Sequence, residues 1–303
     1  MLNLAVIGAR GIGKYHIREF FTKGANVISI LGRTKESSEL TAKMLRKNFG
    51  INVKPYHNLE EMLQKEKIDA ASICTNPETH GYFIKKCLEK RVHVLCEKPL
   101  VAEQNYRNYL KSMALLNLAK KKGKILTVNT QWPSVLENFG NRIKLPLERL
   151  DIYMESGSYG GEMLLDHMPH ANSILTKIIR NGILKHPIIS ERDGEGIYLS
   201  FDYISKGGKS CKARYNFRYN PERPRGVEFV FNGNKFVRKV NENYQQSFIN
   251  KNEEIPIPDP LGESIYRFIE SVENKKKSPL ISEEEILDSA KITDAILQRY
   301  DKV

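Results

Sequence analysis

The sequence has few of the features that mark secreted or metal-binding proteins. Its 303 residues include four cysteines, and no two of them form a C-x-x-C pair. Because most of them lie inside apolar segments, we expect buried free thiols and predict neither disulfides nor a metal site. The four are Cys74, Cys87, Cys96 and Cys211.

Long apolar runs are also absent. No run of about 18 apolar residues occurs, so the sequence predicts no membrane-spanning helix. The chain opens on strand-like residues from Leu2, without the basic and then apolar segments of a signal peptide. We therefore expect a cytoplasmic protein without a membrane partner.

Positive charge is in excess, with a formal net charge of +12 at pH 7. The lysines are dispersed over the expected helix surfaces, and the sequence shows no basic arm or DNA-reading helix. This distribution argues against a nucleic-acid partner. A solvated basic surface is the simpler interpretation, and a positive field that steers an anionic substrate or cofactor is the alternative.

The stretch LAVIGARGIGKYH, residues 4–16, organises the first half of the chain. A short apolar strand runs into a glycine-rich turn, and a helix is expected from Tyr15 to Lys23. The free N–H groups and the dipole of such a helix favour a phosphate. Gly8 and Gly13 match the first and third glycines of the dinucleotide fingerprint G-x-G-x-x-G.

The second fingerprint position holds Arg10, and the glycine is displaced to Gly11. The backbone of this turn, including Ile12, is predicted to contact the cofactor. About 20 residues further on, an acid would bind the ribose 2′-hydroxyl of NAD, whereas cations accommodate the 2′-phosphate of NADP. The next strand ends in Gly32-Arg33-Thr34, without an acid. We predict NADP as the cofactor, with NAD as the alternative, held by Arg33, Thr34 and Arg10.

Alternating strands and helices continue to residue 129, which predicts a parallel sheet with right-handed crossovers. Ligands bind at the carboxyl ends of strands in such sheets. At one strand end, a polar turn offers the predicted cofactor contacts Thr75, Asn76, Pro77 and His80. Another ends in Glu97-Lys98-Pro99-Leu100, where Lys98 is a candidate acid/base group and the bond before the proline is a candidate cis peptide.

In the second half, strands with alternating polar and apolar residues predict an antiparallel sheet, and Asn232-Gly233 predicts a tight hairpin. A helix over residues 163–180 would carry Asp166 and His170 on one face. The alternative is a helix that begins near Pro169, with His170 in its first turn. We interpret the arginines and tyrosines of residues 215–225 as strand surface and a polar loop, with contact to an anionic or sugar substrate as the alternative.

These segments resemble the Gfo/Idh/MocA oxidoreductases, which include glucose–fructose oxidoreductase and inositol dehydrogenase. The resemblance rests on residues 6–16, 74–80, 93–100 and 161–170, where Asp166 and His170 match an Asp-x-Gly-x-His pattern. Met168 replaces the glycine of that pattern, and Arg10 replaces the usual second glycine of the fingerprint.

The resemblance implies a two-domain α/β protein. Residues 1–128 would form a Rossmann domain with a doubly wound parallel sheet. Residues 129–303 would form an α+β domain with a largely antiparallel open sheet, and the C-terminal helices would pack back on the first domain. The open face of that sheet is expected to join copies of the chain into a homodimer or homotetramer.

The resemblance also implies the site. Lys98 is expected to donate a proton to the substrate oxygen or to orient it, with His170 as the acid/base partner and Asp166 positioning His170. Glu97 would hold Lys98, and both are expected near the cofactor. The reaction would be hydride transfer between NADPH or NADH and a carbonyl, carbinol or imine carbon of a small sugar-like or specialised biosynthetic substrate. The alternatives are a non-catalytic dinucleotide-binding regulator and a redox-neutral epimerase or glycosidase that uses NAD.

Overall fold

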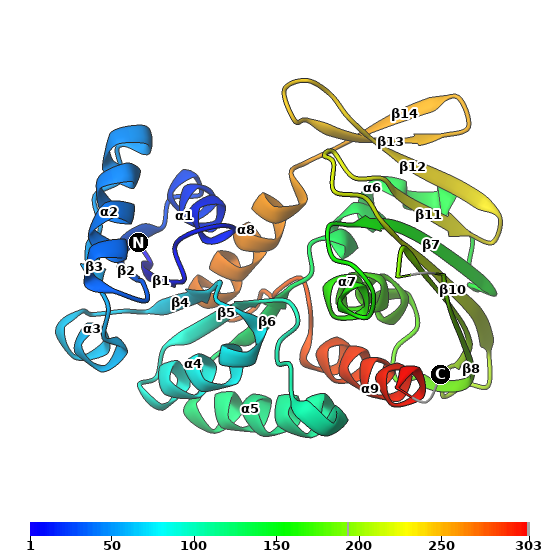
Figure 1. The fold of residues 1–303 in the computed structure, drawn as a ribbon, viewed down its shortest axis with the longest axis horizontal. Coiled ribbons are helices and arrows are strands. Elements are labelled where there is room, and N and C mark those ends of the chain that lie inside the picture. Colours follow the sequence, from blue (N-terminus) through cyan, green and yellow to red (C-terminus); the bar gives the residue numbers. More distant parts are fainter. Residues whose placement is uncertain (193, 302–303) are drawn as a thin grey trace. The chain divides into compact units, whose positions relative to one another are not determined.

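The protein forms two compact units in a computed structural model that describes residues 1–192 and 194–301. Unit 1 comprises residues 1–103, 110–129 and 261–283, and unit 2 comprises residues 104–109, 130–260 and 284–303. Neither unit is one continuous segment, because residues 104–109 are part of unit 2 and residues 261–283 return to unit 1. Figure 1 shows the course of the chain.

Unit 1 is built on a six-stranded sheet with the order β3-β2-β1-β4-β5-β6, in which all pairs are parallel. This order confirms the predicted doubly wound sheet. Helices α1 and α8 lie on one face of the sheet, and α4 and α5 lie on the other (Figure 1). The elements are β1 (Asn3–Ile7), α1 (Gly13–Thr22), β2 (Asn26–Leu31), α2 (Lys35–Phe49), β3 (Lys54–Tyr56), α3 (Leu59–Lys65), β4 (Ala70–Ile73), α4 (Pro77–Glu89), β5 (His93–Glu97), α5 (Asn108–Lys122), β6 (Leu126–Asn129) and α8 (Pro260–Glu273).

Local sequence explains most of these boundaries, with one correction. Thr34 caps α2 by accepting a hydrogen bond from the Ser37 N–H, and Asn58 caps α3 as its position predicts. Helix α4 begins at Pro77, inside the segment that the sequence predicts as a polar turn as far as His80. A proline at the first helical position loses no hydrogen bond, so it can start a helix as readily as a turn. The turn after β4 is therefore shorter than predicted.

The core of unit 1 needs a helix from near the C-terminus. Leu261, Ile265, Phe268 and Ile269 of α8 pack in the cluster formed by apolar residues of β1, β2 and α1. The Phe268 ring meets the Phe20 ring edge-on, with 6.2 Å between centroids. Helix α9 (Glu283–Tyr300) instead contributes Ile292 and Ile296 to the core of unit 2.

Unit 2 contains an eight-stranded sheet with the order β14-β13-β12-β11-β7-β10-β9-β8. One pair, β7 with β10, is parallel and the others are antiparallel, which confirms the predicted largely antiparallel sheet. Helices α7 and α9 cover one face (Figure 1). The elements are α6 (Leu136–Phe139), β7 (Arg149–Ser156), α7 (Glu162–Ile178), β8 (Ile183–Arg192), β9 (Gly196–Ile204), β10 (Ser210–Tyr219), β11 (Val227–Phe231), β12 (Asn234–Val240), β13 (Gln246–Asn250) and β14 (Glu253–Ile257).

Helix α7 settles the choice that the sequence leaves open at Pro169. It begins at Glu162 and continues through the proline to Ile178, so Asp166 and His170 lie in one helix. Pro169 is buried in the helix interior, where it lacks the N–H that would bond to the preceding turn. Within the described residues, no helix is long and apolar enough to cross a membrane.

We expect Phe268→Ala to destabilise unit 1 strongly. The side chain is fully buried, and removing a buried phenylalanine costs about 3–5 kcal/mol of unfolding free energy. Tyr266→Ala, on the exposed side of the same helix, should cost about 0.5 kcal/mol or less. Urea unfolding measures both values. Equal losses for the two variants would contradict the assignment of α8 to this core.

Candidate functional site

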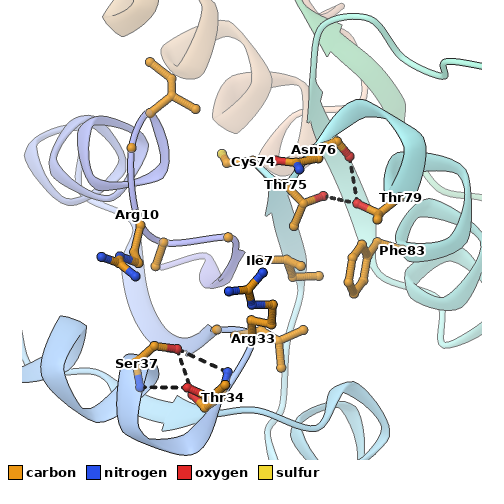
Figure 2. A pocket seen from close by; sticks show the side chains of 16 residues that line it. Ile7, Arg10, Arg33, Thr34, Ser37, Cys74, Thr75, Asn76, Thr79 and Phe83 are labelled. Atoms are coloured by element: carbon orange, nitrogen blue, oxygen red, sulfur yellow. Dashed lines mark hydrogen bonds between the residues drawn. The ribbon is translucent and has the colours of Figure 1, made fainter.

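A cavity of about 820 Å³ lies at the carboxyl ends of β1, β2 and β4. Strand order reverses between β1 and β4, and this is the place where doubly wound sheets bind ligands. The lining residues are Ile7, Gly8, Ala9, Arg10, Gly11, Ile12, Leu31, Gly32, Arg33, Thr34, Ser37, Cys74, Thr75, Asn76, Thr79 and Phe83. Figure 2 shows Arg10, Arg33, Thr34 and Ser37 on one side and Thr75, Asn76, Thr79 and Phe83 on the other.

The glycine turn has no room for side chains at two positions. Gly8 has φ of +86°, and a Cβ there would lie 2.7 Å from the Cys74 carbonyl oxygen. A Cβ on the buried Gly13 would lie 2.1 Å from the Gly8 carbonyl oxygen. The turn leads directly into α1, whose first turn has no acidic residue and no side-chain cap. The positive end of the helix dipole therefore faces the turn without a neutralising acid, which fits a dinucleotide pyrophosphate.

Two arginines give this cavity a positive side. Arg10 and Arg33 are exposed, and within the described part of the chain neither has a carboxylate oxygen within 4.0 Å. Thr34 and Ser37 lie beside them and bond to each other, with the Ser37 N–H donating to Thr34 Oγ1 over 3.1 Å. A second cavity of about 520 Å³ adjoins this side and adds Lys14 and Glu36 to the lining. The side thus offers cations and hydroxyls to a phosphate.

The turn after β4 supplies the opposite side. Two residues that the sequence predicts as cofactor contacts, Thr75 and Asn76, line the cavity. Thr79 and Phe83 of α4 line it as well. The Thr79 hydroxyl lies 2.8 Å from the Thr75 hydroxyl. Sequence analysis did not single out Thr79 and Phe83, which lie four residues apart and therefore on one face of α4.

Pro77 and His80, which the sequence predicts as cofactor contacts, are not among the residues that line the cavity. Pro77 starts α4. His80 is fully buried, with Nδ1 2.8 Å from the Pro99 carbonyl oxygen and Nε2 2.9 Å from the Thr75 carbonyl oxygen. His80 therefore ties the turn after β4 to the loop after β5.

Glu97, at the end of β5, forms a buried network with a residue that the sequence interpretation left without a role. His16 of α1 lies with Nε2 2.8 Å from Glu97 Oε1 and Nδ1 2.9 Å from Ser72 Oγ. Asn129 at the end of β6 donates its amide N–H to the same Glu97 oxygen. The network joins α1 to the ends of β4, β5 and β6. Its signal in the sequence was a histidine on the buried face of a helix.

The charges of this pair reinforce each other. Burial by itself lowers the pKa of His16, but the neighbouring Cys74 and Glu97 outweigh burial and raise the pKa to about 10. Burial by itself raises the pKa of Glu97, but the His16 and Asn129 hydrogen bonds and the Lys98 charge lower it to about 2. At neutral pH, His16 is therefore an imidazolium that donates both ring N–H groups, and Glu97 is a carboxylate.

Lys98 follows Glu97 directly and is half-buried. The Lys98–Pro99 peptide is cis, as the sequence suggested. Lys98 belongs to unit 1, whereas Asp166 and His170 belong to unit 2, so their common action remains a prediction.

Asp166 and His170 line a separate cavity of about 310 Å³ within unit 2. His167, which the sequence analysis did not single out, lines it too, and its Nε2 lies 3.5 Å from an Asp166 carboxylate oxygen. The other lining residues are Gln131, Trp132, Met154, Glu155, Arg223, Pro224, Arg225, Val227, Arg238 and Tyr244.

All four cysteines of the chain are buried and free, as predicted.

We expect Glu97→Gln to cost about 3–5 kcal/mol of unfolding free energy, because it leaves the buried His16 charge without its partner. The folded pKa of His16 lies above its ordinary 6.5, so its contribution is full below pH 6.5 and is lost as pH rises towards 10. The folded pKa of Glu97 lies below its ordinary 4.5, so its contribution is full above pH 4.5 and is lost as pH falls towards 2.

The difference between wild type and Glu97→Gln should therefore peak between pH 4.5 and 6.5 and decline on either side. Urea unfolding across this pH range measures it. Glu89→Gln removes the same charge from an exposed pair with Lys85 and should cost about 0.5 kcal/mol or less at any pH. A cost for Glu97→Gln that does not vary with pH would contradict the ion pair.

Comparison with solved structures agrees with the fold of both units. UDP-N-acetylglucosamine 3-dehydrogenase from Acidithiobacillus ferrooxidans superimposes with a TM-score of 0.76 at 14% identity, covering 100% of this chain and 97% of that one. A mutant 3-ketoreductase from Actinomadura kijaniata, solved in complex with TDP-benzene and NADP, gives a TM-score of 0.74 at 17% identity, covering 98% and 97%. At these identities, the likeness shows a shared fold.

Sequence comparison identifies the N-terminal part of the chain more specifically. Myo-inositol 2-dehydrogenase from Thermotoga maritima is 24% identical over 99 residues, which is 33% of this chain and 28% of that protein. The first three curated relatives are matched over only 20% to 30% of their own length. Residues 2–130 match the family model for Gfo/Idh/MocA, an oxidoreductase family with an NAD-binding Rossmann fold. These residues, less than half of the chain, are thus similar to the NAD-binding Rossmann domain of the Gfo/Idh/MocA oxidoreductases.

Proposed function

We propose that the protein is an NADP-dependent oxidoreductase that transfers hydride between the nicotinamide and a carbonyl, carbinol or imine carbon of a small substrate. The observation that carries this proposal is the cavity at the switch point of unit 1. It combines a glycine turn that has no room for side chains, a helix N-terminus without an acidic residue and two arginines without a nearby carboxylate.

The choice of NADP over NAD rests on the end of β2. An acidic residue that would bind a ribose 2′-hydroxyl is absent there, and the chain continues as Gly32-Arg33-Thr34. Arg10 occupies the position of the second fingerprint glycine and faces the same side of the cavity (Figure 2). Guanidinium groups bind phosphate oxygens through paired N–H donors. The NADP-bound 3-ketoreductase has the same fold, which is compatible with this choice.

The bound cofactor supplies the hydride, so the protein has to orient the substrate and handle one proton. We assign to Lys98 the role of proton donor to the substrate oxygen. Its ammonium group donates a hydrogen bond and stabilises the negative charge that develops on that oxygen. His170 is the second acid/base group, and Asp166 belongs to the same helical face and cavity. A carboxylate beside imidazoles favours their protonated form, which donates.

The buried network behind Lys98 gives this assignment a structural basis. Glu97 is fixed by His16 and Asn129, and Pro99 is fixed through its carbonyl by His80. The backbone on both sides of Lys98 is therefore held, and the lysine side chain is presented from a rigid segment. Rigid support of this kind lowers the reorganisation that a reaction requires.

We expect the double variant Arg10→Gln/Arg33→Gln to weaken NADPH binding by about 100-fold or more, since each of the two charge-assisted hydrogen bonds contributes about 1.5–3 kcal/mol. NADH binding should change by about 3-fold or less, because NADH lacks the 2′-phosphate. Titration of the nucleotide fluorescence measures both. Arg46→Gln removes a charge from the far end of α2 and serves as control. Equal weakening of both nucleotides would contradict a 2′-phosphate site.

Lys98→Met should lower turnover by about 100-fold or more, the range in which removal of a general acid acts, while the dissociation constant for NADPH changes little. Loss of NADPH absorbance with a panel of aldehydes, ketones and imines gives turnover. Lys90→Met, an exposed lysine at the end of α4, is the control. Wild-type turnover in Lys98→Met would refute the role of Lys98. NADPH binding without turnover of any carbonyl would favour the regulatory alternative.

A further inference from the structure

Three arginines line the small cavity of unit 2 and are not used by the proposed chemistry. Arg223 and Arg225 come from the loop between β10 and β11, and Arg238 comes from β12. They share the cavity with His170 and Trp132. Three cations around about 310 Å³ are costly to bring together unless something compensates their charge.

The loop that carries the first two arginines is held firmly. The Glu155 carboxylate on β7 accepts hydrogen bonds from the Gly226 N–H over 2.6 Å and from the Asn220 side-chain amide over 2.8 Å. The Asn220 N–H donates to the Ser156 carbonyl oxygen over 2.7 Å. Burial by itself raises the pKa of Glu155, but these donors, the Tyr153 hydroxyl and the charge of Arg225 lower it. Glu155 is thus occupied in fixing the loop.

Arg225 is placed by a glycine. Its Nε donates to the Asn220 carbonyl oxygen over 2.8 Å, and a Cβ on Gly157 would lie 2.1 Å from its Nη2. The guanidinium therefore occupies space that any other residue at position 157 would fill. Among the described residues, its terminal Nη1 and Nη2 groups have no hydrogen-bond partner.

Arg238 lines the same cavity. Its Nε donates to Gln246 over 2.8 Å, its Nη1 donates to the Arg225 carbonyl oxygen over 3.1 Å, and its guanidinium lies 5.4 Å from the centre of the Trp132 ring. Burial lowers the pKa of Arg238, and the negative charge of Asp259 offsets part of this effect. A cation that has lost hydration in this way gains from an anionic ligand.

Some other arginines of unit 2 have carboxylate partners within the described residues, unlike the three that line this cavity. Arg142 pairs with Glu253, and Arg149 and Arg214 pair with Asp151. In the described part of the chain, none of Arg223, Arg225 and Arg238 has a carboxylate oxygen within 4.0 Å. Asp166 and Glu155 also line the cavity, but Glu155 is saturated by the loop and Asp166 lies beside His167.

We propose that this cavity binds an oxyanion, so that the substrate carries a carboxylate or phosphate group, held by the terminal nitrogens of Arg225 and Arg238 with Arg223 at the exposed rim. That the anion site lies beside the reacting carbon rests on the proposed function, in which His170 of the same cavity takes part. That the cavity binds an anion does not depend on the proposed function. The planar fork of arginine matches both oxyanions, and neutral polyols offer it no charge.

The single tryptophan of the chain provides a readout that needs no turnover. Trp132 lines the cavity under Arg238, so an anion bound there should change its fluorescence. We would titrate the full chain, without nucleotide, with inorganic phosphate, with succinate and with myo-inositol at constant ionic strength. We expect a saturable change with at least one of the two anions and none with myo-inositol. Which anion binds more tightly distinguishes phosphate from carboxylate substrates.

Arg225→Gln should weaken this anion binding by about 10-fold or more, the effect of losing a charge-assisted contact. Gly157→Ala should weaken it as well without changing any charge, because the added Cβ displaces the Arg225 guanidinium. Arg214→Gln removes the same charge from a pair with Asp151 and should leave the affinity unchanged. Far-ultraviolet circular dichroism verifies that each variant is folded.

Two results would overturn the subsite: no saturable fluorescence change with either anion, or equal affinities in Arg225→Gln, Arg214→Gln and wild type. Failure of the proposed function gives a different pattern. Anion binding that depends on Arg225, together with no NADPH binding or turnover, would leave the subsite standing and remove the oxidoreductase assignment. Carbonyl turnover, together with equal anion affinities in Arg225→Gln, Arg214→Gln and wild type, would leave the oxidoreductase assignment standing and remove the subsite.

Discussion

The ion pair between His16 and Glu97 is the constraint on which the site of unit 1 depends. His16 belongs to the helix that starts at the glycine turn, and Glu97 immediately precedes Lys98. Their contact therefore fixes two segments from opposite halves of the sheet in one arrangement. Ser72 and Asn129 extend the same network to the two strands on either side. Without it, the turn that faces the cavity and the loop that carries Lys98 would be supported separately.

Unit 2 uses a carboxylate in a similar structural way. Glu155 holds a loop by accepting N–H groups from its two ends, as Glu97 holds a helix and a strand end. In each unit, hydrogen bonds with the surrounding structure occupy the acid. Arginines line a cavity in each unit: Arg10 and Arg33 in unit 1, and Arg223, Arg225 and Arg238 in unit 2. Positive charge in both cavities is consistent with phosphate-bearing and acidic small molecules as ligands.

The sequence predicted the alternation of β1 to β6 and the glycine turn, because these follow from local patterns, and several of the positions that it singled out line the cavity of unit 1. It did not predict β8, β13 and β14, because their sequences lack a clear alternation of polar and apolar residues, although each of these strands pairs with a strand that is adjacent in the chain. Nor could it pair His16 with Glu97, since 81 positions separate them. His80 was misread because a polar residue after a strand is as suitable for fixing backbone carbonyls as for meeting a ligand.

The return of residues 261–283 to the nucleotide-binding unit has a consequence for biosynthesis. When the ribosome has made the first 130 residues, every strand of the parallel sheet exists, but the apolar surface around Ile17 and Phe20 still lacks its covering helix. That surface stays exposed until residues 261–283 have emerged. Until then, unit 1 lacks part of its core, and exposed apolar surface of this kind makes an incompletely folded chain prone to aggregate.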